Sequence, residues 1–174
     1  MRKICLLAFS FLIFLLSFNI SFAEILSPTP TPQVNYELPY PGLLPDSPLY
    51  FLRMIRDKIV GFLISDPLKK AEFNLLQADK RLNASIYIFN KGKTSLALST
   101  VSKAENYFSE ALDKMRDAKM EGRNINEMEE KLRSALRKHK QELENFVKKE
   151  NVNFMAGFKK EQKRVMGFEE RLNQ

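Results

Sequence analysis

Cysteine and histidine are nearly absent from the sequence, which holds one of each among its 174 residues. The cysteine, Cys5, lies in an N-terminal apolar run, so the remainder can form neither an intramolecular disulfide nor a thiolate metal site. The histidine, His139, has Glu142 three residues later. A metal site needs three or four ligands, and di-iron helical bundles use Glu-x-x-His, whereas Leu136 precedes His139 by three. We therefore predict no metal and no cofactor, and place His139 on or beside a packed helix seam.

The usual catalytic arrangements are also absent from the sequence. It has no glycine-rich phosphate loop and no plausible pairing of a nucleophile with a base. Carboxylates are abundant, but their spacing is typical of solvated helix faces rather than of an acid–base pair. These carboxylates include Asp113, Asp117, Glu129 and Glu130. The sequence predicts a protein that is not an enzyme.

Glycine is scarce, with six residues, and tryptophan is missing, while Lys, Glu, Leu and Ala are frequent. No run alternates apolar and polar residues as a half-buried strand would. The sequence predicts an all-α fold. The formal net charge is +7, but basic and acidic residues are interleaved along every expected helix, which is typical of solvated faces and argues against nucleic-acid binding.

The first 23 residues have the composition of a secretory signal. Arg2 and Lys3 precede the apolar run 4–22, and Ser21 and Ala23 occupy the small positions before a cleavage point. We expect cleavage after Ala23. The alternative is an uncleaved anchor, because the run is nearly long enough to span a bilayer. Both interpretations predict a secreted or extracytoplasmic protein of the cell envelope.

Residues 24–45 hold six of the eight prolines. They predict an extended, polyproline-like spacer without a core of its own. At about 3.1 Å per residue, this spacer could hold the following domain up to roughly 60 Å from a membrane.

Residues 46–174 are expected to form an elongated antiparallel bundle of four to five helices. Apolar residues at three- and four-residue steps predict helices over about 48–64, 67–91 and 127–149, and one between the second and the last of these with a seam over 97–118. Gly92 and Gly122 are expected to end the second and third helices. The pattern resumes over 154–172. Whether the last two are one bent helix or two is left open by the pattern. Three residues are predicted to cap helix starts because their side chains can accept from unpaired first-turn amides: Ser47, Asp66 and Asn126.

The expected helix over 48–64 is too broadly apolar for one packing face. Something must cover so wide a surface, because monomers seldom expose large apolar patches. We predict that it either docks across the bundle or forms the surface that a partner uses. The residues of this candidate surface are Leu49, Tyr50, Phe51, Leu52, Met54, Ile55, Ile59 and Phe62.

The block over 41–53, PGLLPDSPLYFLR, resembles the start of the DUF5667 domain, an uncharacterised bacterial and archaeal family. Members typically open with Pro-(Asp/Gly)-Ser-Pro-(Leu/Phe)-Tyr-x-(Leu/Val)-(Lys/Arg), and the resemblance extends over about 41–150. It implies an exported or membrane-anchored helical domain. It implies no activity and no catalytic residue.

Taken together, the sequence predicts a non-enzymatic, extracytoplasmic helical module for interaction or scaffolding. Its expected partner is a protein or a second copy of itself, with no nucleic acid, and with membrane contact only through an uncleaved leader. The alternative is a ligand- or stress-sensing helical bundle of the periplasmic type.

Overall fold

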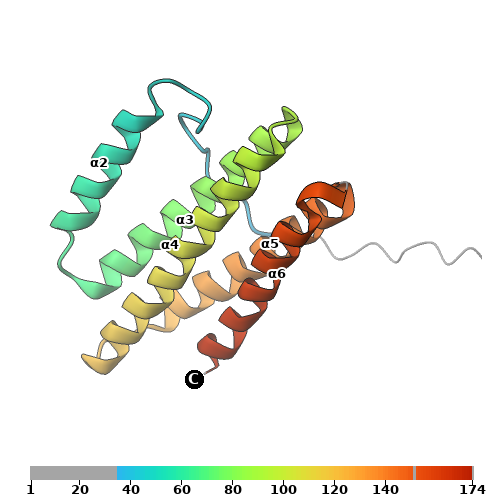
Figure 1. Ribbon diagram of the computed structural model, residues 1–174. Coiled ribbons are helices and arrows are strands. Elements are labelled where there is room, and N and C mark those ends of the chain that lie inside the picture. Colours follow the sequence, from blue (N-terminus) through green and yellow to red (C-terminus); the bar gives the residue numbers. More distant parts are fainter. Residues whose placement is uncertain (1–34, 151, 174) are drawn as a thin grey trace, which may run out of the picture. The chain divides into compact units, whose positions relative to one another are not determined.

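The structure, a computed structural model, describes residues 35–150 and 152–173 (Figure 1). The predicted leader and the first part of the predicted spacer lie outside these residues. Five helices and no strand are present within them, so the fold is all-α. The helices are α2 (Tyr50–Leu63), α3 (Pro67–Asn90), α4 (Thr94–Met120), α5 (Asn126–Lys149) and α6 (Val152–Leu172).

The most extensive contact between helices joins α3 to α4, which lie side by side as an antiparallel hairpin (Figure 1). Gly92 ends α3 and Gly122 follows α4, each with φ of 75°, a left-handed conformation that costs glycine little. The two helices approach closely because the seam positions carry small side chains. The completely buried alanines of this seam are Ala71, Ala78, Ala97, Ala104, Ala111 and Ala118.

Helices α5 and α6 are separate, which answers the question that the sequence left open. Glu150 has extended backbone, with φ −85° and ψ 140°, and breaks the helical path after α5. The two helices are antiparallel, since the Arg133 guanidinium donates to the Leu172 carbonyl at 2.9 Å while Phe146 stacks on Phe158 with ring centroids 5.0 Å apart. They close the bundle over α3 and α4.

The helix starts differ in part from expectation. Asp66 is the N-cap of α3, and its Oδ1 accepts from the Lys69 amide at 2.9 Å. Ser47 is not a cap, because α2 begins only at Tyr50 and the Ser47 hydroxyl reaches just the Leu49 amide at 3.4 Å.

Asn126 is not a cap either, because it is the first residue of α5 itself. Its own amide donates to Oδ1 of Asn124 at 3.1 Å. The oxygen-bearing side chain at this helix start therefore stands two residues earlier than the sequence pattern indicated.

The predicted spacer does not stay clear of the bundle over its described part. Tyr36 and Leu38 pack against the core, and the Asn83 side chain donates to the Pro39 carbonyl at 2.9 Å. Asp46 lies near the C-terminal end of α3, where Lys91 and Lys93, just after that helix, pair with it at 3.1 and 2.8 Å. This segment therefore runs along α3 in the direction of α3, and only residues 24–34 remain as the expected spacer.

Candidate functional site

Helix α2 packs on the bundle through its polar side. Among the described helices it contacts α3 and no other. Its buried residues are Arg53, Asp57 and Gly61, which recur every four residues and so share one face. No apolar side chain of α2 is buried in this contact.

Two carbonyl groups and a carboxylate hold the Arg53 side chain, which is 7% exposed. Its Nη1 donates to the carbonyls of Pro41 and Leu43, the latter at 2.7 Å, and its Nε lies 3.6 Å from Oδ2 of Asp57. Burial lowers the pKa of Arg53, while the negative charge of Asp57 opposes that shift. The guanidinium therefore links α2 to the segment that precedes it.

Asp57, which is 4% exposed, sits among three guanidinium groups. Its carboxylate lies 2.7 Å from Arg56, 3.6 Å from Arg53 and 3.8 Å from Arg81 of α3. Arg81 also lies over the Tyr107 ring, 4.1 Å from its centroid. This group of one carboxylate and three cations keeps a net positive charge.

The end of α2 approaches α3 closely because residue 61 is glycine. A Cβ at Gly61 would lie 3.1 Å from Cε1 of Phe73. The Lys70 ammonium donates to the Gly61 carbonyl, which satisfies an acceptor in the last turn of α2. The α2–α3 contact is thus short and partly ionic.

The remaining circumference of α2 is apolar and exposed. Phe62 is 85% exposed and Ile55 is 52% exposed. Of the candidate surface predicted from sequence, only Tyr50 is half-buried. The first predicted alternative, docking of this apolar surface across the bundle, is therefore wrong, because the ion pairs of Arg53 and Asp57 turn the apolar side outward. We call the following exposed residues the α2 surface: Leu49, Phe51, Leu52, Met54, Ile55, Ile59, Val60, Phe62 and Leu63.

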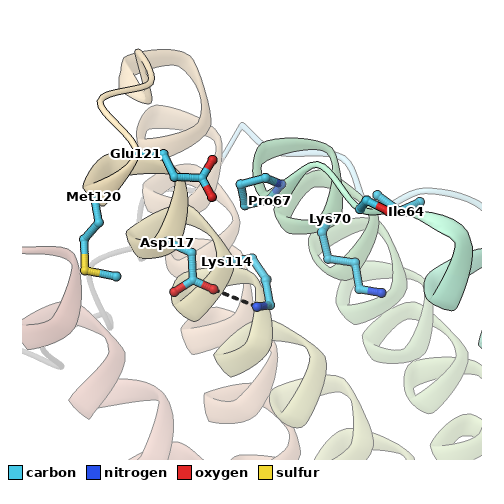
Figure 2. Close-up of a pocket in the computed structure, with 8 residues that line it drawn as sticks. Ile64, Pro67, Lys70, Lys114, Asp117, Met120 and Glu121 are labelled. Carbon is cyan, nitrogen blue, oxygen red and sulfur yellow. Dashed lines mark hydrogen bonds and ion pairs between the residues drawn. The ribbon is translucent and has the colours of Figure 1, made fainter.

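A hollow of about 500 Å³ lies beside the turn from α2 to α3. Figure 2 shows that its lining comes from this turn, from the start of α3 and from the end of α4, with Lys114 joined to Asp117 at 2.6 Å. Lys70 and Glu121 complete its charged lining, so two cations meet two carboxylates. This balance offers no unmatched charge to a ligand.

His139 lies at the centre of a buried polar cluster inside the bundle. Its side chain is 0% exposed; Nδ1 lies 2.9 Å from Oε1 of Glu105, and Nε2 lies 3.1 Å from Oδ1 of Asp79. The Tyr36 hydroxyl donates to the second oxygen of Asp79 at 2.6 Å. Phe108 packs on the imidazole, with ring centroids 4.9 Å apart. The cluster therefore joins the segment before α2 to α3, α4 and α5.

The two carboxylates keep the His139 imidazole protonated. Burial lowers the pKa of His139, but the charges and hydrogen bonds of Glu105 and Asp79 outweigh it and raise the pKa to about 10. Burial, and then the Asp79 charge and hydrogen bond, raise the pKa of Tyr36. With both ring nitrogens donating to carboxylates, the imidazole has no lone pair for a metal ion or for proton abstraction.

The sequence placed His139 on a seam but did not identify its partners. Asp79 and Glu105 each directly follow a buried alanine of the seam, Ala78 and Ala104. This position beside the seam was the signal in the sequence that could have identified them. Glu142, the expected neighbour of His139, instead pairs with Lys138 at 2.7 Å.

The other carboxylates considered for catalysis form surface pairs or face solvent. Asp113 pairs with Arg171 at 3.0 Å, Glu129 with Arg133 at 2.6 Å and Asp117 with Lys114, while Glu130 is exposed. Across the part of the chain that the structure describes, no three His, Cys, Asp or Glu side chains are grouped to hold a metal ion. None of its helices has the length and hydropathy needed to cross a membrane.

The comparison with known families is decided by one match. A family model described as "Domain of unknown function (DUF5667)" covers residues 42–165. The chain belongs to the DUF5667 family. The match begins just before α2 and ends within α6, so the exposed α2 surface and the His139 cluster lie inside the DUF5667 region, apart from Tyr36 of that cluster. No curated protein and no solved structure matches the chain.

Proposed function

We propose that this DUF5667 protein is a non-enzymatic helical module of the extracytoplasmic space, and that its α2 surface is an interaction surface for another component of the cell envelope. The observation that carries the proposal is the orientation of α2, which buries Arg53 and Asp57 while leaving Phe62 and Ile55 exposed. Exposed apolar patches of this kind typically mark interaction sites. The leader expected from the sequence supports the extracytoplasmic location.

The bundle below α2 serves as a rigid support in this proposal. The His139 cluster fixes the mutual positions of α3, α4 and α5, and the ion pairs of Asp57 fix α2 on α3. Because the pKa of His139 is raised to about 10, its charge does not change near neutral pH. The cluster is therefore a fixed structural link whose charge is constant around neutral pH.

A photocrosslinking amino acid at Phe62, in the full chain within its native cell envelope, tests the proposal. Phe62 projects from the end of α2 and is the most exposed residue of the α2 surface. We expect a covalent adduct from position 62. The matched control places the same group at Met166, an exposed apolar residue of α6, where we expect none. Absence of any adduct from positions 62, 55 and 51 would contradict the proposed function, whatever the class of partner.

A further inference from the structure

The α2 surface has an apolar arc flanked by basic residues. At 100° per residue, the buried residues Arg53, Asp57 and Gly61 define one side of α2. The opposite side carries apolar residues without interruption: Phe51, Leu52, Ile55, Ile59, Phe62 and Leu63. The exposed residues Arg56 and Lys58 lie at the two edges of this arc. The helix therefore presents a hydrocarbon strip between two positive charges.

No exposed acidic residue balances these charges on α2. Its one carboxylate, Asp57, is buried and shared among Arg53, Arg56 and Arg81. The Arg56 side chain remains 66% exposed although it touches Asp57. The local excess of positive charge is thus directed toward whatever covers the arc.

This charge pattern argues against a second copy as the occupant. A two-fold interface brings the same patch of each copy together. Antiparallel α2 helices would then place Arg56 and Lys58 of one copy opposite those of the other, with no carboxylate between them. Like charges at such an interface oppose association. An occupant with negative charge beside an apolar layer fits better.

The surface of an anionic lipid bilayer has this chemistry. Interfacial helices bury an apolar face about 5–10 Å into the boundary between headgroups and acyl chains, with Lys and Arg at the phosphates. Helix α2 contacts only α3 among the described helices and lies at the side of the bundle (Figure 1). The residues of its apolar arc are exposed. Helix α2 is also the first of the described helices along the chain. The expected spacer, residues 24–34, would reach about 35 Å from a retained leader at about 3.1 Å per residue.

We propose that the α2 surface docks in the plane of an anionic membrane surface. Phe51, Ile55, Ile59 and Phe62 enter the lipid, Arg56 and Lys58 contact lipid phosphates, and the bundle of α3–α6 remains in water. This inference rests on the proposed function, because it names the occupant of the same surface. It also departs from the expectation that membrane contact occurs only through an uncleaved leader.

Vesicle binding by the chain from residue 24 onward tests the inference without the leader. The described core lies wholly between Tyr36 and Leu172, so this chain keeps it. We expect co-sedimentation with phosphatidylcholine vesicles that contain phosphatidylglycerol, little with phosphatidylcholine alone, and weakening by salt. The double variant Ile55→Gln with Ile59→Gln should weaken the partition coefficient by more than about tenfold, since both side chains lose their transfer into lipid. Arg56→Gln with Lys58→Gln should weaken binding to the anionic vesicles alone.

Matched control variants distinguish α2 from the rest of the surface. Leu76→Gln with Met166→Gln removes two exposed apolar residues outside α2 and should leave binding unchanged. Lys159→Gln with Lys160→Gln removes two exposed charges of α6 and should have only a small effect. Thermal melts of each variant verify folding. A fluorophore on Phe62→Cys, the sole cysteine once the leader is absent, should shift to the blue with anionic vesicles, whereas one on Met166→Cys should not.

Several outcomes would overturn the inference. If the protein binds neutral and anionic vesicles equally, charge has no role in binding. If the control variants lose as much vesicle binding as the α2 variants, α2 has no specific role. A crosslink from position 62 to a protein, or a stable dimer without vesicle binding, would overturn membrane docking but leave the proposed function standing. A lipid adduct at position 62 supports both. No adduct and no vesicle binding would contradict both.

Discussion

Helices α2 and α5 are both amphipathic, but α5 buries its apolar side whereas α2 buries its polar side. On α5 the buried residues are apolar apart from His139, and the charged residues are exposed or half-buried. On α2 the buried residues are Arg53, Asp57 and Gly61, and the apolar residues face solvent. The difference shows that the residues of the neighbouring helix decide which side of an amphipathic helix is buried. Helix α5 packs against seam residues of α3 and α4. Helix α2 instead contacts Arg81, Phe73 and Lys70 of α3.

The largest expected difference between the two helices comes from placing a carboxylate on each apolar side. Leu132→Asp puts an unpaired charge into the core of α5, and we expect it to lower the free energy of unfolding by more than about 4 kcal/mol or to prevent folding. Ile55→Asp on α2 should change it by less than about 0.5 kcal/mol, because Ile55 is in water. Urea denaturation of both variants measures this. A large loss in Ile55→Asp would show that α2 packs by its apolar side.

The exception on α5, His139, provides the next test. His139→Gln leaves Asp79 and Glu105 buried without their cation, and we expect a loss of about 3–5 kcal/mol at pH 6. The folded-state pKa of about 10 lies above the ordinary value of 6.5. The stability that protonation contributes is therefore fully present below pH 6.5 and lost as the pH rises through about 10.

The measurement is the free energy of unfolding of wild type and His139→Gln from pH 6 to above 10. The difference between the two should shrink as the pH rises across this interval. Subtracting the free energy of unfolding of the variant from that of wild type removes the contribution of lysines that titrate in the same pH range. A difference that stays constant with pH would contradict a protonated His139.

Loosening the buried ion pairs should release α2 without unfolding the bundle. Asp57→Asn removes the carboxylate that Arg53 and Arg81 share, so α2 loses its ion pair with α3 and keeps only the contacts around Gly61. We expect amide hydrogen exchange over Tyr50–Leu63 to accelerate by about tenfold or more, with α4 and α5 little changed. Mass spectrometry of peptic fragments detects this. Glu130→Gln, an exposed change on α5, is the control and should alter neither region.

The smallest expected effect concerns the helix starts. Asp66→Ala removes the cap of α3 and should lower the free energy of unfolding by about 1 kcal/mol. Ser47→Ala and Asn126→Ala should cost a few tenths of that, because neither side chain caps a helix. Thermal melts compare the three. Equal losses at all three positions would argue for the capping pattern that the sequence alone indicated.

Much of the bundle follows from sequence because its signals are local. Periodic apolar residues predicted α3, α4 and α5, and Gly92 and Gly122 predicted the ends of α3 and α4. The orientation of α2 could not be predicted, since it depends on Arg53 meeting the carbonyls of Pro41 and Leu43 and on Arg81, far along the chain. An apolar arc indicates that a face must be covered but does not say which face meets the bundle.

The His139 cluster was missed for the same reason. Its partners Asp79 and Glu105 are 60 and 34 residues away, on other helices. A histidine on a seam does require hydrogen-bond partners when buried. An alignment of the helix seams with one another could have suggested the polar residues beside Ala78 and Ala104 as partners of His139.

The segment before α2 also determines how the molecule would carry tension. A chain held near its N-terminal end passes force first to the bonds from Tyr36 to Asp79 and from Asn83 to Pro39, both on α3. Asp79 transmits that force through His139 to Glu105, and so across the bundle to α4. Helix α2 lies beyond these attachments along the chain and bears no load until they break. The fold thus isolates its exposed helix mechanically from a pull on the N-terminal end of the chain.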